Sequence, residues 1–389
     1  MAAARPCQSR APAGVLACAA MTTAEAKTVG DLVRAMEEVA PTRFAEPWDN
    51  VGLLVGDPAA RLARVVLTID LTREALEEAT RAGGDVAIVS YHPPIFQAQK
   101  RFVADSIAWA AARAGVAVYS PHTALDAADG GTNDVLADAL GMTARAPLRV
   151  AEQKDRELKL VTFVPEEHVE RVSEALFAAG AGRIGKYESC SFRSPGTGTF
   201  FGGEGTNPVV GQAGRLELAP ELRLETVVPN ARAAEVVRAL RSAHPYEEPA
   251  FDLVRLAAPP SGLGPGRVGS VERGPLRAHV ARIKKALGVE HLLVAGALDR
   301  EVASAAVCAG SGGELVADAI AAGADLFLTG EVRHHDALRA AAAGLAVVCT
   351  RHSVSERAAL GAVARRLGEL LPGVPVTRAT SDADPLAFA

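Results

Sequence analysis

Short apolar runs alternate with amphipathic segments along most of the chain, and this alternation limits the possible folds more than any other feature. The first strands are predicted at 65–70, 85–92 and 116–122. Helices are predicted between and after them, at 71–83, 105–114 and 133–140. Continuous aliphatic and β-branched strands separated by helices are typical of a parallel sheet covered on both faces. The sequence therefore predicts an α/β lobe over 26–148.

The same alternation returns after a Pro/Gly-rich stretch, APPSGLGPGR. Strands are predicted at 291–297, 324–332 and 345–352, and 301–310 is interpreted as a strand at the sheet edge. The predicted helices are 280–288, 314–323, 335–344 and 356–371. This pattern predicts a second α/β lobe over 259–389.

The segment between the lobes, 149–258, has a different pattern. Its predicted order is strand, helix, strands, helix, strand, which is typical of a small ferredoxin-like α+β unit. Glycines are concentrated in its middle, PGTGTFFGGEGTNPVVGQAG, where they permit tight turns. We expect a long hairpin or flap there, within a domain inserted between the two lobes.

Composition excludes several classes of protein. The chain of 389 residues carries 41 Lys and Arg against 46 Asp and Glu, a net charge of −5, so general nucleic-acid binding is not predicted. Apolar runs are too short for a membrane span. The five cysteines form no C-x-x-C pair, which argues against a disulfide framework or zinc knuckle and favours the cytoplasm.

The first residues, 1–25, resemble a signal peptide only weakly, because the apolar stretch is short and rich in alanine. We interpret them as an unstructured leader or a mis-assigned start, with Met21 as a second possible start. Export is the alternative interpretation.

Histidines and acids gather where predicted strands end. His92 ends one strand, His122 ends another with Asp126 four residues on, and His352 precedes Glu356 by one helical turn. Ligands of open α/β sheets bind at the carboxyl ends of strands, and imidazole with carboxylate suits Zn, Fe, Mn or Co. Taken singly, each residue has a structural alternative: a hydrogen-bonded loop histidine, a turn-shaping aspartate, or a first-turn glutamate favoured by the helix dipole.

Several motifs together resemble one family. They are PWDNVGLLVG, YHPPIF, SPHTALDAADGGTNDVLADALG, FFGGEGTNPVVG, HPYEEPAFD, GEVRHHDAL and RHSVSE. In this order the chain resembles the GTP cyclohydrolase I type 2 homologue family, the Nif-three-like group of dinuclear-metal proteins, in its long form with a PII-like insertion. The resemblance implies a bilobal fold around a two-metal site and a toroidal homohexamer.

The resemblance also implies a ligand set. Carried over, the metal ligands are His92, Asp126, His352 and Glu356, with Glu356 bridging two ions. Tyr91 stands where the family has a further histidine. A phenol, with an ordinary pKa of about 10, is a poor replacement for imidazole. We therefore expect one firm and one weaker site for a divalent cation.

The expected function is a metal-dependent hydrolase of GTP or a related heterocycle, as the family name implies. The alternative is a non-catalytic regulatory or scaffold protein that senses a small molecule through its inserted domain.

Other motif residues have more than one interpretation. His122, His334 and His335 are proton carriers, partners of the ligands or structural residues. Asp49 and Asn50 shape a loop. Glu247 and Glu248 form a solvated turn, or attract a cation or a partner, and 311–315 is a weak phosphate-loop candidate.

Overall fold

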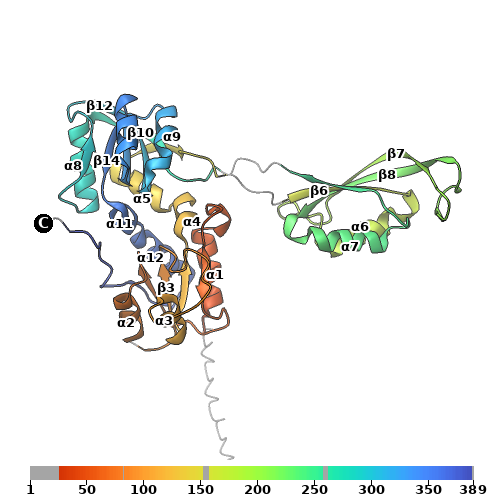
Figure 1. Cartoon of the computed structure of the whole chain (residues 1–389), viewed down its shortest axis with the longest axis horizontal. Coiled ribbons are helices and arrows are strands. Elements are labelled where there is room, and N and C mark those ends of the chain that lie inside the picture. The colour runs from red at the N-terminus through yellow and green to blue at the C-terminus, as the bar shows by residue number, and fades with distance from the viewer. Residues whose placement is uncertain (1–25, 82, 152–156, 257–261, 388–389) are drawn as a thin grey trace, which may run out of the picture.

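The computed structural model describes residues 26–81, 83–151, 157–256 and 262–387. It forms two α/β lobes and an inserted α+β unit (Figure 1). The predicted leader, 1–25, lies outside the described residues. Within the described part of the chain, no helix combines the length and apolar character needed to cross a membrane.

The first lobe is built on a five-stranded sheet in the order β1-β4-β3-β2-β15. Strands β4, β3, β2 and β15 are parallel, and β1 pairs antiparallel at one edge. The strands are β1 (Gly52–Val55), β2 (Arg64–Thr68), β3 (Val86–Ser90), β4 (Ala117–Ser120) and β15 (Val376–Arg378).

Helices cover both faces of this sheet, as the continuous apolar strands predicted. On one face Leu32 and Met36 pack with Leu367 against Val65 and Leu67. On the other face a separate cluster joins two helices to the alternate residues of the same strands. The helices of the first face are α1 (Val29–Val39) and α12 (Ala359–Leu370), and those of the second are α2 (Arg73–Arg81) and α3 (Ile107–Arg113).

The second lobe has a six-stranded mixed sheet in the order β11-β14-β13-β12-β10-β5. Its strands are β5 (Thr143–Pro147), β10 (Arg267–Pro275), β11 (Leu293–Ala295), β12 (Glu301–Ser311), β13 (Leu326–Glu331) and β14 (Ala346–Cys349). Two separate apolar clusters cover its faces. The covering helices are α5 (Thr132–Leu140) and α8 (Leu276–Leu287) on one face, and α9 (Val316–Ala321) and α10 (His334–Ala342) on the other.

The prediction that 301–310 forms a strand at the sheet edge is wrong. β12 lies inside the sheet, parallel to β13 and antiparallel to β10. Val307 and Ala309 face one apolar cluster while Ala306 and Cys308 face the other. Small residues on both sides allow this strand to be buried between helices.

Each lobe contains elements from the part of the chain that mainly forms the other lobe. Helix α5 and strand β5, which precede the insertion, belong to the second sheet, where Pro147 pairs with Arg267. Helix α12 and strand β15, at the end of the chain, belong to the first sheet. These crossings place α11 (His352–Arg357) and α4 (His122–Ala127) between the lobes' sheets and next to the site described below.

The inserted unit has a four-stranded antiparallel sheet in the order β7-β8-β6-β9. Its elements are β6 (Glu157–Val164), α6 (Val169–Ala178), β7 (Ser191–Phe201), β8 (Leu216–Pro229), α7 (Ala233–Ala243) and β9 (Phe251–Arg255). Both helices pack on one face through Val172, Leu176, Val236 and Leu240. The expected α+β order and the long hairpin, β7–β8, are confirmed; the closer comparison with PII proteins stays a prediction.

Candidate metal centre

Three predicted ligands come together where strands of both lobes end. His92 follows β3 of the first lobe by two residues, and α11 follows β14 of the second lobe. Because α11 begins at His352, its first turn presents His352 and Glu356 on one side. The helix predicted over 356–371 therefore begins one turn earlier, as the inferred pairing of these two side chains on one helix face requires, and that pairing is confirmed.

The three side chains form a compact donor set. Glu356 lies 3.4 Å from His92 Nε2 through Oε2 and 3.2 Å from His352 Nε2 through Oε1. All three offer donor atoms within 4.8 Å of one another. Glu356 is buried, and its Oε2 has no hydrogen-bond partner among the described residues. A buried carboxylate whose two oxygens each lie near one imidazole nitrogen, one of them without a hydrogen bond, fits a divalent cation.

Two further carboxylates orient the imidazoles. His92 Nδ1 lies 2.9 Å from Asp70 Oδ1, and His352 Nδ1 lies 3.1 Å from Glu331 Oε1. Each histidine thus turns Nδ1 to a carboxylate and Nε2 to Glu356, as metal-ligating histidines do. The sequence reasoning missed Asp70 and Glu331. Both stand at or just after the carboxyl end of a strand, β2 or β13, which is the signal that locates them.

The charges of this cluster are strongly coupled. Burial lowers the pKa of the His92 imidazole, but Asp70 and Glu356 outweigh it and raise that pKa to about 10. The hydrogen bond to Glu356 is the main cause that raises the pKa of His352 to about 9. Burial favours the protonated Glu356, yet both histidines hold its pKa below the ordinary value. Without an ion the site therefore retains protons that a cation would displace.

Asp126 lies in the same cavity but in a different arrangement. Its carboxylate is outside the group of three and accepts a hydrogen bond from the Tyr91 hydroxyl. Burial raises the pKa of Asp126 to about 6 against the lowering effect of that hydrogen bond. Tyr91, which the resemblance places where a ligand histidine is expected, therefore contacts a predicted ligand directly.

His122 opens α4 instead of ending β4, so its predicted place on the strand is wrong. Its backbone has a φ of 30°, a region that non-glycine residues rarely adopt. Its Nδ1 lies 2.8 Å from Asp49 Oδ1, and Thr123 also donates to Asp49. Burial raises the pKa of Asp49, but the hydrogen bonds with His122 and Thr123 outweigh this effect and hold the pKa below its ordinary value. Asn50 donates to the Ile95 carbonyl at 2.6 Å, so the predicted loop-shaping role is confirmed.

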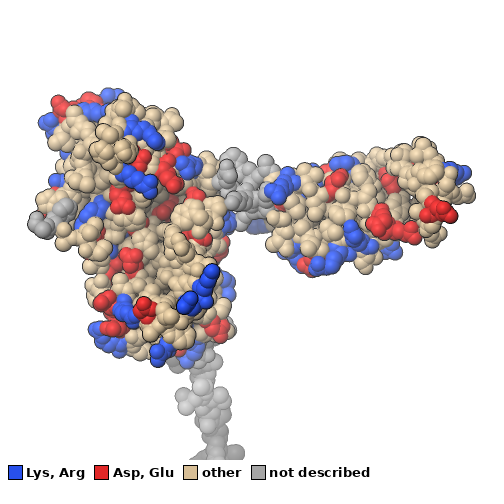
Figure 2. Space-filling view, in the orientation of Figure 1, with Lys and Arg blue, Asp and Glu red and all other residues tan. Residues whose placement is uncertain are grey.

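The cluster opens into a cavity of about 600 Å³. Trp48 and Phe96 line it, with their ring centroids 5.8 Å apart, and the Trp48 ring is 6.0 Å from His122. Basic side chains also line it: Arg149, Arg333 and Arg339. Figure 2 shows acidic and basic side chains interspersed over the visible face.

Other predicted residues divide between the cavity and the surface. Residues 311 and 313–315 line the cavity. His334 and His335 stand at the start of α10 with ring centroids 5.5 Å apart, and both are exposed outside the cavity lining. Glu247 and Glu248 belong to the inserted unit, where they line a separate pocket.

Comparison with known proteins agrees with this architecture. The model of the family described as DUF34/NIF3 (NGG1p interacting factor 3) matches residues 27–385. A protein of Halalkalibacterium halodurans named GTP cyclohydrolase 1 type 2 homolog is 36% identical, covering 95% of this chain and 100% of that relative. A Bacillus subtilis protein of the same name is 34% identical, over 92% of this chain and 97% of the relative.

Solved structures give the same result. The crystal structure of a Bacillus cereus protein related to NIF3 is similar with a TM-score of 0.69 and 32% identity, covering 94% of this chain and 100% of that one. The Staphylococcus aureus protein SA1388 is similar with a TM-score of 0.76 and 26% identity over the same shares. The chain belongs to the DUF34/NIF3 family.

Proposed function

We propose that the protein is a divalent-metal-dependent hydrolase that acts on a phosphorylated heterocycle such as a nucleotide. The observation that carries this proposal is the convergence of His92 Nε2 and His352 Nε2 on the buried Glu356 at one end of the cavity. The names of the relatives, GTP cyclohydrolase 1 type 2 homolog, support GTP as the first substrate to test.

The roles of the side chains follow from their positions. His92, His352 and Glu356 would hold the ion, with Asp126 as a further carboxylate beside it. A bound Zn, Fe, Mn or Co ion lowers the pKa of a coordinated water towards neutrality. His122 lines the same cavity, and Asp49 holds its Nδ1. Its remaining nitrogen is suited to carry a proton to or from the substrate.

The cavity wall supports a substrate with a ring and phosphates. Trp48 and Phe96 offer aromatic faces for a planar ring. Arg333 and Arg339 line the cavity, and no ion pair joins either guanidinium to another described residue. Unpaired guanidinium groups bind phosphate oxygens well.

Turnover of GTP tests the proposal. Protein loaded with Mn, Zn or Fe is incubated with GTP, and pterin fluorescence is followed beside a His352→Ala variant. We expect turnover in the wild type and its loss in the variant. Absence of turnover with every metal would refute the cyclohydrolase activity, and equal turnover in both proteins would reveal a contaminating enzyme.

The second candidate function is a metal-binding regulator or scaffold without catalysis. The hydrogen bond from Tyr91 to Asp126 favours it, because that bond engages a carboxylate that a catalytic ion would use. This candidate predicts tight metal binding with no turnover of GTP. Metal binding measured on the same preparations therefore separates the two functions.

The family resemblance also supports a homohexamer in the cytoplasm with a PII-like inserted domain. Large apolar side chains such as Phe102 and Trp109, 55% and 41% exposed, are available for contacts between subunits. Light scattering coupled to size exclusion is expected to give six copies per particle. A monomer at micromolar concentration would contradict the proposal.

A further inference from the structure

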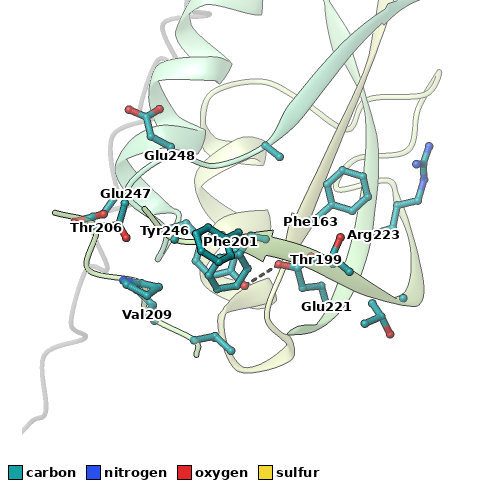
Figure 3. A pocket seen from close by; sticks show the side chains of 18 of the residues that line it. Phe163, Thr199, Phe201, Thr206, Val209, Glu221, Arg223, Tyr246, Glu247 and Glu248 are labelled. Carbon is teal, nitrogen blue, oxygen red and sulfur yellow. Dashed lines mark hydrogen bonds between the residues drawn. The ribbon is translucent and has the colours of Figure 1, made fainter. Parts of the chain in front are cut away.

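A second pocket lies in the inserted unit, far along the chain from the metal ligands. Pairing between β6 and β8 ends at Val164 and Leu222, but the β7–β8 hairpin continues to Phe201 and Leu216. Where the hairpin leaves the sheet it borders a cavity of about 610 Å³ (Figure 3). This volume is typical of sites for small molecules.

The walls of the pocket are aromatic, and its free charges are negative. Aromatic rings come from Phe163, Phe200, Phe201 and Tyr246, and carboxylates from Glu221, Glu247 and Glu248. The basic residue Arg223 is already engaged, because its Nε lies 2.7 Å from Glu225 and its guanidinium 5.8 Å from the Phe163 ring. The pocket therefore disfavours phosphates and favours cations or N–H donors.

The position of the Glu221 carboxylate depends on two neighbours, one that donates a hydrogen bond and one that leaves room for it. The Tyr246 hydroxyl donates to Glu221 Oε1 at 2.7 Å, as the dashed line in Figure 3 shows. Burial and the Glu221 carboxylate raise the pKa of Tyr246, so this phenol stays protonated and donates. A Cβ at Gly198 would clash with Glu221 Oε2. The position of the carboxylate thus depends on a glycine in the facing strand.

We propose that this pocket binds a flat aromatic ligand whose edge carries adjacent N–H donors, such as an aryl amidine or an aminopyrimidine-type ring, and which has no phosphate. A carboxylate has about four lone-pair sites, so Glu221 can accept two parallel N–H bonds while it keeps its bond to Tyr246. The surrounding rings favour a flat or cationic group. The site is independent of the metal centre and makes the inserted unit a ligand-binding domain in either proposed function.

Benzamidine tests the proposal, because it combines a phenyl ring with an amidinium edge, and benzoate is its control of opposite charge. Both are titrated into the full-length protein by calorimetry. We expect benzamidine to bind at least about tenfold more tightly than benzoate. Glu221→Gln keeps the shape of the side chain but removes its charge, and we expect it to weaken benzamidine binding by at least about tenfold.

Two more variants make the result specific. Gly198→Ala leaves Glu221 in the sequence but displaces its flexible carboxylate, and we expect a comparable loss of affinity with an unchanged circular dichroism spectrum. His352→Ala alters the metal centre and is expected to leave benzamidine binding unchanged. The proposal is overturned if benzamidine fails to bind, if benzoate binds equally well, if Glu221→Gln and Gly198→Ala bind like wild type, or if His352→Ala abolishes binding.

Discussion

The hydroxyl of Tyr91 donates a hydrogen bond to Oδ1 of Asp126, at the position where related sequences are expected to have a metal-ligating histidine. Tyr91 is 1% exposed, and burial raises the pKa of its phenol well above the ordinary value. The phenol therefore stays neutral and acts as a hydrogen-bond donor. It gives Asp126 a partner within the protein instead of providing a nitrogen for a second ion.

Replacement of Tyr91 by histidine is expected to create a second tight metal site. The wild type should retain one divalent ion per chain after dialysis, because its firm site has a complete donor set and its weaker site lacks a neutral nitrogen. Tyr91→His should retain two, as measured by inductively coupled plasma mass spectrometry.

Tyr91→Phe is the matched control, since it removes the hydroxyl without adding a ligand. It should retain one ion, like the wild type. Two tightly held ions in the wild type, with the Tyr91 oxygen outside their coordination, would show that the substitution does not weaken the second site.

Glu356→Gln is expected to weaken metal binding by more than about a hundredfold, because it removes the negative charge placed between the two Nε2 atoms. Glu331→Gln is the comparison. Glu331 contacts His352 on the far side, at Nδ1, and loss of such an orienting partner typically costs about 10- to 100-fold. Competition with a chelating dye measures both affinities; equal losses would mean that Glu356 is not a ligand.

Local sequence patterns predicted most helices and strands but not which sheet each one joins. Helix α5 begins one residue before the predicted 133–140 and ends where the sequence predicts. Its partners, however, include Leu276 and Ile283, which lie beyond the inserted unit. Helical periodicity shows that one face of a helix is buried, but it does not show which residues cover that face. Only the structure therefore reveals which lobe each segment joins.

The site shows the same division. Spacing alone predicted that His352 and Glu356 share a helix face, since this depends only on helical geometry. The orientation of His92 by Asp70 and the hydrogen bond from Tyr91 to Asp126 depend on side-chain directions in segments that follow different strands. The sequence therefore predicted three members of the cluster but not the carboxylates that orient them.

Arg267 and Asp134 form a buried ion pair between β10 and α5, and its loss is expected to destabilise the lobes. Two guanidinium nitrogens of Arg267 lie 2.9 Å from the Asp134 carboxylate, and Arg267 also donates to the Ala128 carbonyl at 2.7 Å. Arg267→Met leaves Asp134 charged, buried and without this partner, which should cost about 3–5 kcal/mol.

Urea unfolding followed by tryptophan fluorescence measures this loss, because both tryptophans, Trp48 and Trp109, lie in the lobes. The control is Arg282→Met, which removes an exposed pair with Glu272 and should cost about 0–1 kcal/mol. Equal effects of the two variants would contradict a stabilising role for the buried pair.

Glu78 on α2 holds the end of the chain, and this contact is expected to make stability depend on pH in the acid range. Its carboxylate accepts hydrogen bonds from the Thr380 and Ser381 backbones at 2.8 and 3.0 Å. These bonds lower its pKa from 4.5 to about 2. Because the folded state has the lower pKa, the stabilisation is present above pH 4.5 and is lost as the pH falls towards 2.

Glu78→Gln should remove this part of the pH dependence, on the order of 1 kcal/mol once solvent screening is considered. Unfolding midpoints measured at intervals from neutral pH to pH 2 should converge for the variant and wild type at the acid end. Glu77→Gln, one residue away on the same helix, is the control and should follow the wild-type profile. A Glu78→Gln profile parallel to that of the wild type throughout would show that protonation of Glu78 is not coupled to unfolding.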